Sequence, residues 1–393
     1  MTNRKLYIFN PDNDLALANG DENYMPPAST RKMTLDLALL PIWYATPDSF
    51  VLAPSAYNLS FRNEMNHHFA SLPVLITEPE VTMSSDFLPV PWGWNVALRK
   101  YLYRLGISDL SLPDMGELNN LRDFSSRLKA VYLLPTLQLN PSFCGFSAYS
   151  SSINELETFL EKYPEVILKA PWSGSGKGLC YVRNGLSVPV INWCSRVIRQ
   201  QGGIVIEPLY QKVEDFAMEF YLDRGKVSFV GYSLFYTGTG GAYEGSFLLT
   251  DKAIESALLC YVSAADLAAL RFHLEDKLFR MFSATYIGYI GVDMMICSFK
   301  EKPQYRIHPC VELNLRMNMG VLARLFYDHY VVQGNIGKFR VQYFSNQGDA
   351  LRKHEEFQQK YPVCISGGRL AKGYFSLTPV TIHTQYVATV LLD

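Results

Sequence analysis

The sequence predicts a mixed fold, α/β in its first third and partly α+β beyond it. Short apolar runs at 6–9, 50–52 and 74–77 alternate with segments of helical spacing, a pattern typical of a small parallel sheet. From Val166 onward strands dominate, and Asp223-Arg-Gly225 predicts the turn of an antiparallel hairpin. We therefore expect an N-terminal α/β domain followed by a larger domain rich in antiparallel strands.

Composition places the chain among folded globular proteins. It has 393 residues, of which 48% are hydrophobic and 19% charged, enough for two or three domains with cores. The net charge of −1 provides no broad basic surface for nucleic acid. The seven cysteines form no CxxC pair, and neither the start of the chain nor any apolar run is long enough for a signal peptide or a membrane span. We expect a cytoplasmic protein without nucleic-acid or membrane partners, and a homodimer stays open.

The remaining elements follow from local periodicity. Apolar residues at helical spacing predict helices at 95–105, 118–130, 153–162, 190–200 and 263–281. Apolar and aromatic runs predict strands at 166–169, 179–183, 203–207, 215–223, 226–235 and 291–298. Ser111-Leu-Pro-Asp-Met-Gly116 carries the turn residues of a domain boundary.

The most informative segment is Arg306–Arg316, which we interpret as a strand whose side chains alternate between two faces. One face is apolar, whereas the other carries Arg306, His308, Cys310, Glu312, Asn314 and Arg316. Glu312 and Asn314 offer the hard oxygen ligands that Mg²⁺ prefers, and Arg316 is a fork-shaped anion binder. This face therefore predicts a site for a metal-bound phosphate.

A second carboxylate, Asp293, interrupts an apolar strand. Burying an unpaired carboxylate is costly, so Asp293 needs a cation or a donor. A metal ion shared with Glu312 and Asn314 satisfies this need, and a salt bridge to Arg306 or Arg316 is the alternative.

A glycine-rich loop follows the strand that ends in Lys169. Its small residues allow backbone N–H groups to approach a phosphate, although a plain flexible connection is the alternative. Pro171 and Gly178 exclude a Walker A loop. Further on, Glu207 ends a strand that can offer backbone donors and acceptors to the edge of adenine. Asp215 occupies a strand face where a carboxylate can accept bonds from ribose hydroxyls, and a solvated surface carboxylate is the alternative.

In this order, the segments resemble the ATP-grasp superfamily, which includes D-alanine–D-alanine ligase, glutathione synthetase and biotin carboxylase. The resemblance covers about residues 118–330. It implies an ATP-grasp fold with an N-terminal Rossmann-like α/β pre-ATP-grasp domain. The implied domains are 1–115 (pre-ATP-grasp), 116–330 (ATP-grasp, with a small lid subdomain at about 165–210) and 331–393 (a C-terminal extension packing on the ATP-grasp domain).

The resemblance also implies residue roles. ATP would be bound by Arg122, Lys169, Ser173, Gly174, Ser175, Gly176, Lys177, Gly178, Glu207, Leu209 and Asp215. Mg²⁺ would be bound by Asp293, Glu312 and Asn314, and the catalytic residues would be Arg316 and Lys169.

The implied activity is that of an ATP- and Mg²⁺-dependent ligase, which joins a small carboxylate to an amine or a thiol through an acyl phosphate. Two alternatives stay open, a small-molecule kinase on the same scaffold and a nucleotide-binding protein without catalysis. The intact set of candidate metal ligands argues against the second alternative. The identity of the substrates does not follow from the fold.

Overall fold

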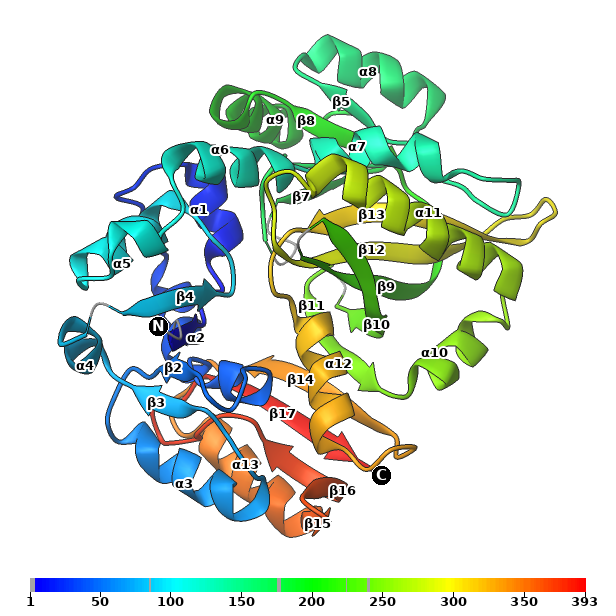
Figure 1. The fold of residues 1–393 in the computed structure, drawn as a ribbon. Coiled ribbons are helices and arrows are strands. Elements are labelled where there is room, and N and C mark those ends of the chain that lie inside the picture. The colour runs from blue at the N-terminus through cyan, green and yellow to red at the C-terminus, as the bar shows by residue number, and fades with distance from the viewer. Residues whose placement is uncertain (1–3, 85, 175–177, 224, 239–240) are drawn as a thin grey trace. The chain divides into compact units, whose positions relative to one another are not determined.

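The structure is a computed structural model that describes residues 4–84, 86–174, 178–223, 225–238 and 241–393. The predicted Ser175, Gly176 and Lys177 lie outside the described residues. Contacts divide the chain into two compact units, which are described separately (Figure 1). The first unit contains residues 1–119, 244–253 and 316–393, and the second contains residues 120–243 and 254–315.

The first unit contains the predicted parallel sheet. Its strands are, in spatial order, β3 (Val74–Ile76), β2 (Phe50–Leu52), β1 (Arg4–Ile8) and β4 (Phe87–Pro91). Three of these strands were predicted, and β4 was missed because Pro89 and Pro91 indicated a turn. The strand lies at the edge of the sheet, where a missing backbone N–H is tolerated.

Helices connect these strands (Figure 1). They are α1 (Asn13–Asn19), α2 (Ala28–Asp36), η1 (Leu40–Trp43), α3 (Asn58–His68), α4 (Glu78–Thr82), α5 (Val96–Arg104) and η2 (Asp109–Ser111). The predicted helix at 95–105 corresponds to α5, and the Asn95 side chain caps it by accepting a 2.9 Å hydrogen bond from the Leu98 N–H. Leu98 and Leu102 pack on Leu6 and Phe87 of the sheet, so α5 covers this part of the core.

The C-terminal segment belongs to the same unit. Its strands are, in spatial order, β11 (Tyr243–Leu248), β14 (Gly337–Tyr343), β17 (Tyr386–Leu392), β16 (Arg369–Ser376) and β15 (Cys364–Ser366), and its helices are α12 (Met319–Tyr330) and α13 (Asp349–Lys360). The buried Trp43 donates from Nε1 to the Leu377 carbonyl at 2.7 Å, and Asp36 accepts a bond from the Gln385 N–H at 2.9 Å. By their contacts, residues 316–393 group with residues 1–119, and the predicted packing of a C-terminal extension on the ATP-grasp domain stays a prediction.

The second unit contains a small antiparallel sheet at 148–208. Its strands are, in spatial order, β5 (Ala148–Ser150), β8 (Ile204–Pro208), β6 (Val166–Lys169) and β7 (Leu179–Val182). Helices α8 (Ile153–Lys162) and α9 (Val188–Gln201) pack on it through a common apolar core that includes Leu156, Leu168 and Val197. The lid subdomain predicted at about 165–210 overlaps these elements and stays a prediction.

The other sheet of this unit carries the long strands. They are, in spatial order, β13 (Tyr305–Asn314), β12 (Gly288–Ser298), β9 (Lys212–Asp223) and β10 (Lys226–Thr237), all antiparallel. The predicted hairpin is β9–β10. The helices are α6 (Met115–Phe124), whose last residues enter this unit, α7 (Leu128–Leu133), η3 (Leu134–Leu137), α10 (Asp251–Leu258) and α11 (Ala264–Phe282). The helix predicted at 118–130 is therefore interrupted between α6 and α7.

All seven cysteines are free thiols, and Cys144, Cys194, Cys297 and Cys310 are buried. Within the described ranges, no helix combines the length and the apolar character needed to cross a membrane. Burial raises the pKa of the Cys194 thiol to about 11, so this side chain is a neutral part of the core.

Candidate active site

A buried ion pair joins the two central strands of the small sheet. Lys169 at the end of β6 places its Nζ atom 2.6 Å from Oε2 of Glu207 on β8, and both side chains are 5% exposed. The adjacent antiparallel strands bring the two residues together, since Ile167 lies opposite Glu207. Ser147 donates to Glu207 Oε1 at 3.2 Å. The sequence therefore located both charges correctly but did not predict that they neutralise each other.

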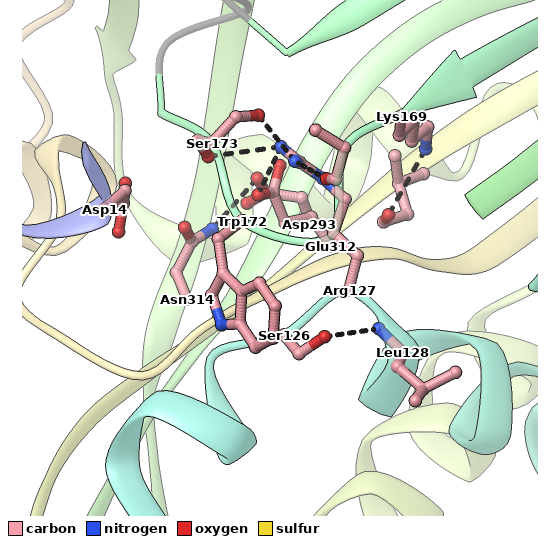
Figure 2. A network of polar contacts seen from close by, with 12 residues as sticks. Asp14, Ser126, Arg127, Leu128, Lys169, Trp172, Ser173, Asp293, Glu312 and Asn314 are labelled. Atoms are coloured by element: carbon pink, nitrogen blue, oxygen red, sulfur yellow. Dashed lines mark hydrogen bonds and ion pairs between the residues drawn. The ribbon is translucent and has the colours of Figure 1, made fainter. Parts of the chain in front are cut away.

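Three oxygen-bearing side chains come together where the end of β13 lies opposite the middle of β12. Asp293 lies directly opposite Glu312, and Asn314 donates from Nδ2 to Asp293 Oδ2 at 3.0 Å (Figure 2). Among the described residues, no group of three or more His, Cys, Asp and Glu side chains is arranged to hold a metal ion. The predicted Mg²⁺ site thus consists of two carboxylates and one amide, whose oxygen atoms suit a hard cation that keeps several waters.

Arg127 connects these side chains to the glycine-rich loop, and it was missed in the sequence. Its buried guanidinium donates from Nη2 to Glu312 Oε1 at 2.8 Å and from Nη1 to Ser173 Oγ at 2.6 Å (Figure 2). Nη1 also donates to the Ala170 carbonyl at 2.7 Å. Arg127 precedes α7 in a segment without a recognisable motif, and its position five residues after Arg122 was the only signal available.

Arg122, the predicted basic residue, lies on α6 and contacts Trp172 at the start of the same loop. Its guanidinium is 4.3 Å from the centroid of the Trp172 ring, and its carbonyl accepts a 2.7 Å bond from Trp172 Nε1. The loop closes by a bond of 2.8 Å from the Ala170 N–H to the Gly178 carbonyl. A Cβ atom at Gly178 would lie 2.2 Å from Ser173 Oγ, so only glycine fits at this position.

Of the residues predicted to hold the nucleoside, Glu207 lies on β8, Leu209 directly follows β8, and Asp215 lies on β9. Asp215 on β9 accepts a 3.1 Å bond from Thr237 Oγ1 and forms an ion pair with Lys212. The Leu209 N–H donates to the Glu165 carbonyl at 2.9 Å, so a nucleobase that binds this N–H has to displace that carbonyl.

Arg316 lies beyond the end of β13 and belongs to the first unit. There it forms a two-point ion pair with Asp14, with 2.8 Å from Nε to Oδ1 and 2.6 Å from Nη2 to Oδ2. Planar paired bonds of this kind orient a guanidinium strongly. Arg306, in the second unit, lies with its guanidinium 4.2 Å from the centroid of the Phe299 ring.

His308 on β13 is fully buried on the strand face predicted to carry the site. Burial lowers the pKa of its imidazole to about 4; Glu207 opposes this shift and Lys169 adds to it. The ring is therefore neutral near pH 7.

This histidine predicts a dependence of stability on pH. Between pH 6.5 and pH 4 the unfolded ring takes up a proton that the folded ring refuses, so the free energy of unfolding falls as the pH falls through this window. We expect His308→Leu to lose less stability than the wild type between these pH values. Urea unfolding at both ends of the window measures the difference.

His67→Leu, at an exposed histidine of the first unit, provides the control. Equal pH dependence in the wild type and in His308→Leu would contradict the prediction.

Comparisons with known proteins support the fold. No family model matches the sequence, and no curated protein matches it. The solved structures that resemble the whole chain include two biotin carboxylases. Biotin carboxylase from Campylobacter jejuni is 11% identical with a TM-score of 0.52, and the match covers 99% of this chain and 87% of that one. The biotin carboxylase domain of Hydrogenobacter thermophilus 2-oxoglutarate carboxylase is 10% identical with a TM-score of 0.51, and the match covers 99% of this chain and 86% of that one. At these identities the likeness concerns the fold alone. This chain therefore has the ATP-grasp fold, as the resemblance of its sequence implied.

Proposed function

We propose that this protein is an ATP- and Mg²⁺-dependent ligase that joins a carboxylate to an amine or a thiol. The observation that carries the proposal is the contact of Arg127 with both Glu312 and Ser173, which ties the candidate metal ligands to the candidate phosphate loop. The two biotin carboxylase structures of similar fold were determined as complexes, one with an ATP compound and the other with MgADP, ADP and bicarbonate.

Phosphate binding would fall to the cations around the loop. Lys169 is held at the end of β6, and its Nζ atom is 3.5 Å from the Val311 carbonyl, next to Glu312 on β13. We add Arg127 to the predicted Arg122 as a phosphate contact, since its guanidinium already lies against Ser173. Glu207, Leu209 and Asp215 would hold the nucleoside.

Asp293, Glu312 and Asn314 would hold Mg²⁺ through their oxygen atoms. When bound, the ion supplies positive charge that neutralises the oxygens of the transferring phosphoryl group. Arg127 assists by holding the Glu312 carboxylate through Oε1.

The proposed reaction takes place between the substrates, and it needs no nucleophilic side chain from the protein. A carboxylate oxygen of the substrate attacks the γ-phosphorus of ATP, the bond to the β-phosphate breaks, and ADP and an acyl phosphate result. The amine then attacks the acyl carbon, phosphate leaves with the bonding electrons, and the amine loses a proton. The role of the protein is to position the reactants and to stabilise negative charge.

The proposal is tested by incubating the protein with MgATP and paired panels of small carboxylates and amines or thiols. ADP release together with an amide or thioester in the mass spectrum supports it, and so does a hydroxamate when hydroxylamine replaces the amine. ADP released together with a phosphorylated alcohol would identify a kinase instead, and failure to bind ATP by calorimetry would overturn the proposal.

We also propose that Arg316 contacts the transferring phosphoryl group. Arg316→Ala is then expected to lower kcat by about 100-fold or more, the loss typical of a charge stabiliser. Asp14→Asn should cost less than about 10-fold, because its amide oxygen still accepts one bond from Arg316. Steady-state kinetics of the two variants makes the comparison, and equal losses would instead assign the arginine to a structural ion pair.

A further inference from the structure

His308 is a buried polar side chain that the proposed reaction does not use. It is 0% exposed, and neither Nδ1 nor Nε2 has a hydrogen-bond partner among the described residues. Buried polar atoms are nearly always paired, so two unpaired nitrogens on one ring require an explanation.

The surroundings of the ring belong to the candidate nucleotide site. Glu207 and Lys169 are the two charged groups that act on it, one from β8 and one from β6. On the neighbouring strand β12, Met295 lies directly opposite His308. Tyr210, just after β8, packs edge-on against the imidazole with 5.6 Å between the ring centroids. The imidazole thus lies beside Glu207, which is expected to hold the nucleoside, and Lys169, which is expected to contact phosphate.

One edge of the ring faces the segment that precedes β5. A Cβ atom at Gly145 would lie 2.8 Å from His308 Nε2, so the absence of a side chain there makes room for the ring. The Gly145 carbonyl accepts a bond from Gln138 and does not bond the imidazole. Two residues later, Ser147 bonds Glu207, so the same short segment covers both side chains.

We propose that His308 is a specificity-determining residue that hydrogen-bonds the adenine base of the bound nucleotide. The inference rests on the proposed function and deepens it. A neutral imidazole offers one donor and one acceptor, and the edge of adenine offers an amino donor beside ring nitrogens that accept. Binding of adenine would therefore satisfy ring nitrogens that the ligand-free protein leaves unpaired. Because the ring is covered, the Lys169–Glu207 ion pair opens when the base enters.

The test compares His308→Leu and His308→Gln with the wild type. Leucine has a similar volume without polar atoms, so in the ligand-free protein we expect an unchanged or higher melting temperature, since two unpaired buried nitrogens disappear. The Kd for ATP, measured by calorimetry without other substrates, should rise about 10-fold, the value of one good hydrogen bond. The Kd for GTP should change less than about 3-fold, so the preference for ATP over GTP falls. His308→Gln, whose amide replaces the lost polar atoms, should recover part of that preference.

A histidine with only a structural role would give the opposite pattern, in which His308→Leu melts at a lower temperature and keeps the nucleotide preference. That result would overturn the inference. His354→Leu, in the first unit, serves as the matched control and should leave both nucleotide affinities unchanged. If the wild type binds neither ATP nor GTP, the proposed function itself fails, whereas unchanged preference in a His308→Leu protein that binds ATP overturns this inference alone.

Discussion

Glu312→Gln is expected to lower kcat about 1000-fold while the protein stays folded. The amide oxygen of glutamine can still accept the bond from Arg127, so the link to the glycine-rich loop survives. The negative charge that would bind Mg²⁺ is lost, and removal of one electrostatic contact to a transition state typically costs 10²–10³-fold, about 3–4 kcal/mol. Loss of a metal ligand should also raise the Mg²⁺ concentration needed for half-maximal activity. Steady-state kinetics across a Mg²⁺ titration measures both effects.

Two further variants separate the metal role from the structural one. Glu312→Ala removes the acceptor as well and leaves the guanidinium of Arg127, which is 5% exposed, without its carboxylate; it should therefore also unfold at lower urea concentration. Glu155→Gln, an exposed carboxylate on α8, should behave like the wild type. Turnover by Glu312→Gln within about 10-fold of the wild type would remove Glu312 from the set of metal ligands.

Lys169→Met is expected to lower the free energy of unfolding by about 3–5 kcal/mol and to abolish nucleotide binding. The two side chains of the Lys169–Glu207 pair are 5% exposed, so removal of the cation leaves a buried carboxylate that, within the part of the chain the structure describes, keeps the hydrogen bond from Ser147. Breaking one side of a buried ion pair usually costs this much because the remaining charge is uncompensated. Urea unfolding and ATP calorimetry provide the two measurements.

The double variant Lys169→Met/Glu207→Leu tests whether the lost stability comes from the uncompensated carboxylate of Glu207. Replacing both charges with apolar groups removes the uncompensated carboxylate, so stability should return to within about 1 kcal/mol of the wild type. Nucleotide binding should stay lost, since both proposed contacts are gone. Lys129→Met breaks an ion pair with Asp123, which is 60% exposed, and should cost less than about 1 kcal/mol. A single variant Lys169→Met as stable as Lys129→Met would show that Glu207 is not left as a buried charge.

Local sequence patterns located much of the candidate site. Helix α8 begins and ends where its spacing predicted, and Lys169 closes a strand of four residues, as its apolar run indicated. The alternation of apolar and polar side chains along β13 indicated Glu312 and Asn314 as candidate metal ligands. Strand β12 places Asp293 directly opposite Glu312. These features depend on neighbours within a few positions, because strand and helix periods are properties of short segments.

Features that depend on the path of the chain needed the structure. Arg127 could not be selected over Arg122 by any motif, and it became recognisable only when the fold brought Glu312 and Ser173 to its guanidinium. Strand β4 was not predicted, because prolines usually argue against a strand. They are tolerated here because β4 lies at the edge of the sheet and has a single neighbour.

The sequence by itself determined the succession of elements, the superfamily they resemble and the residue types of a phosphate and metal site. Only the tertiary structure decided the partners: Asp14 bonds Arg316 from 302 positions away, and Lys169 bonds Glu207 across two strands. The physical reason is that periodicity and turn chemistry act over short distances along the chain, whereas an ion pair forms between whichever charges the packed strands and loops bring within reach.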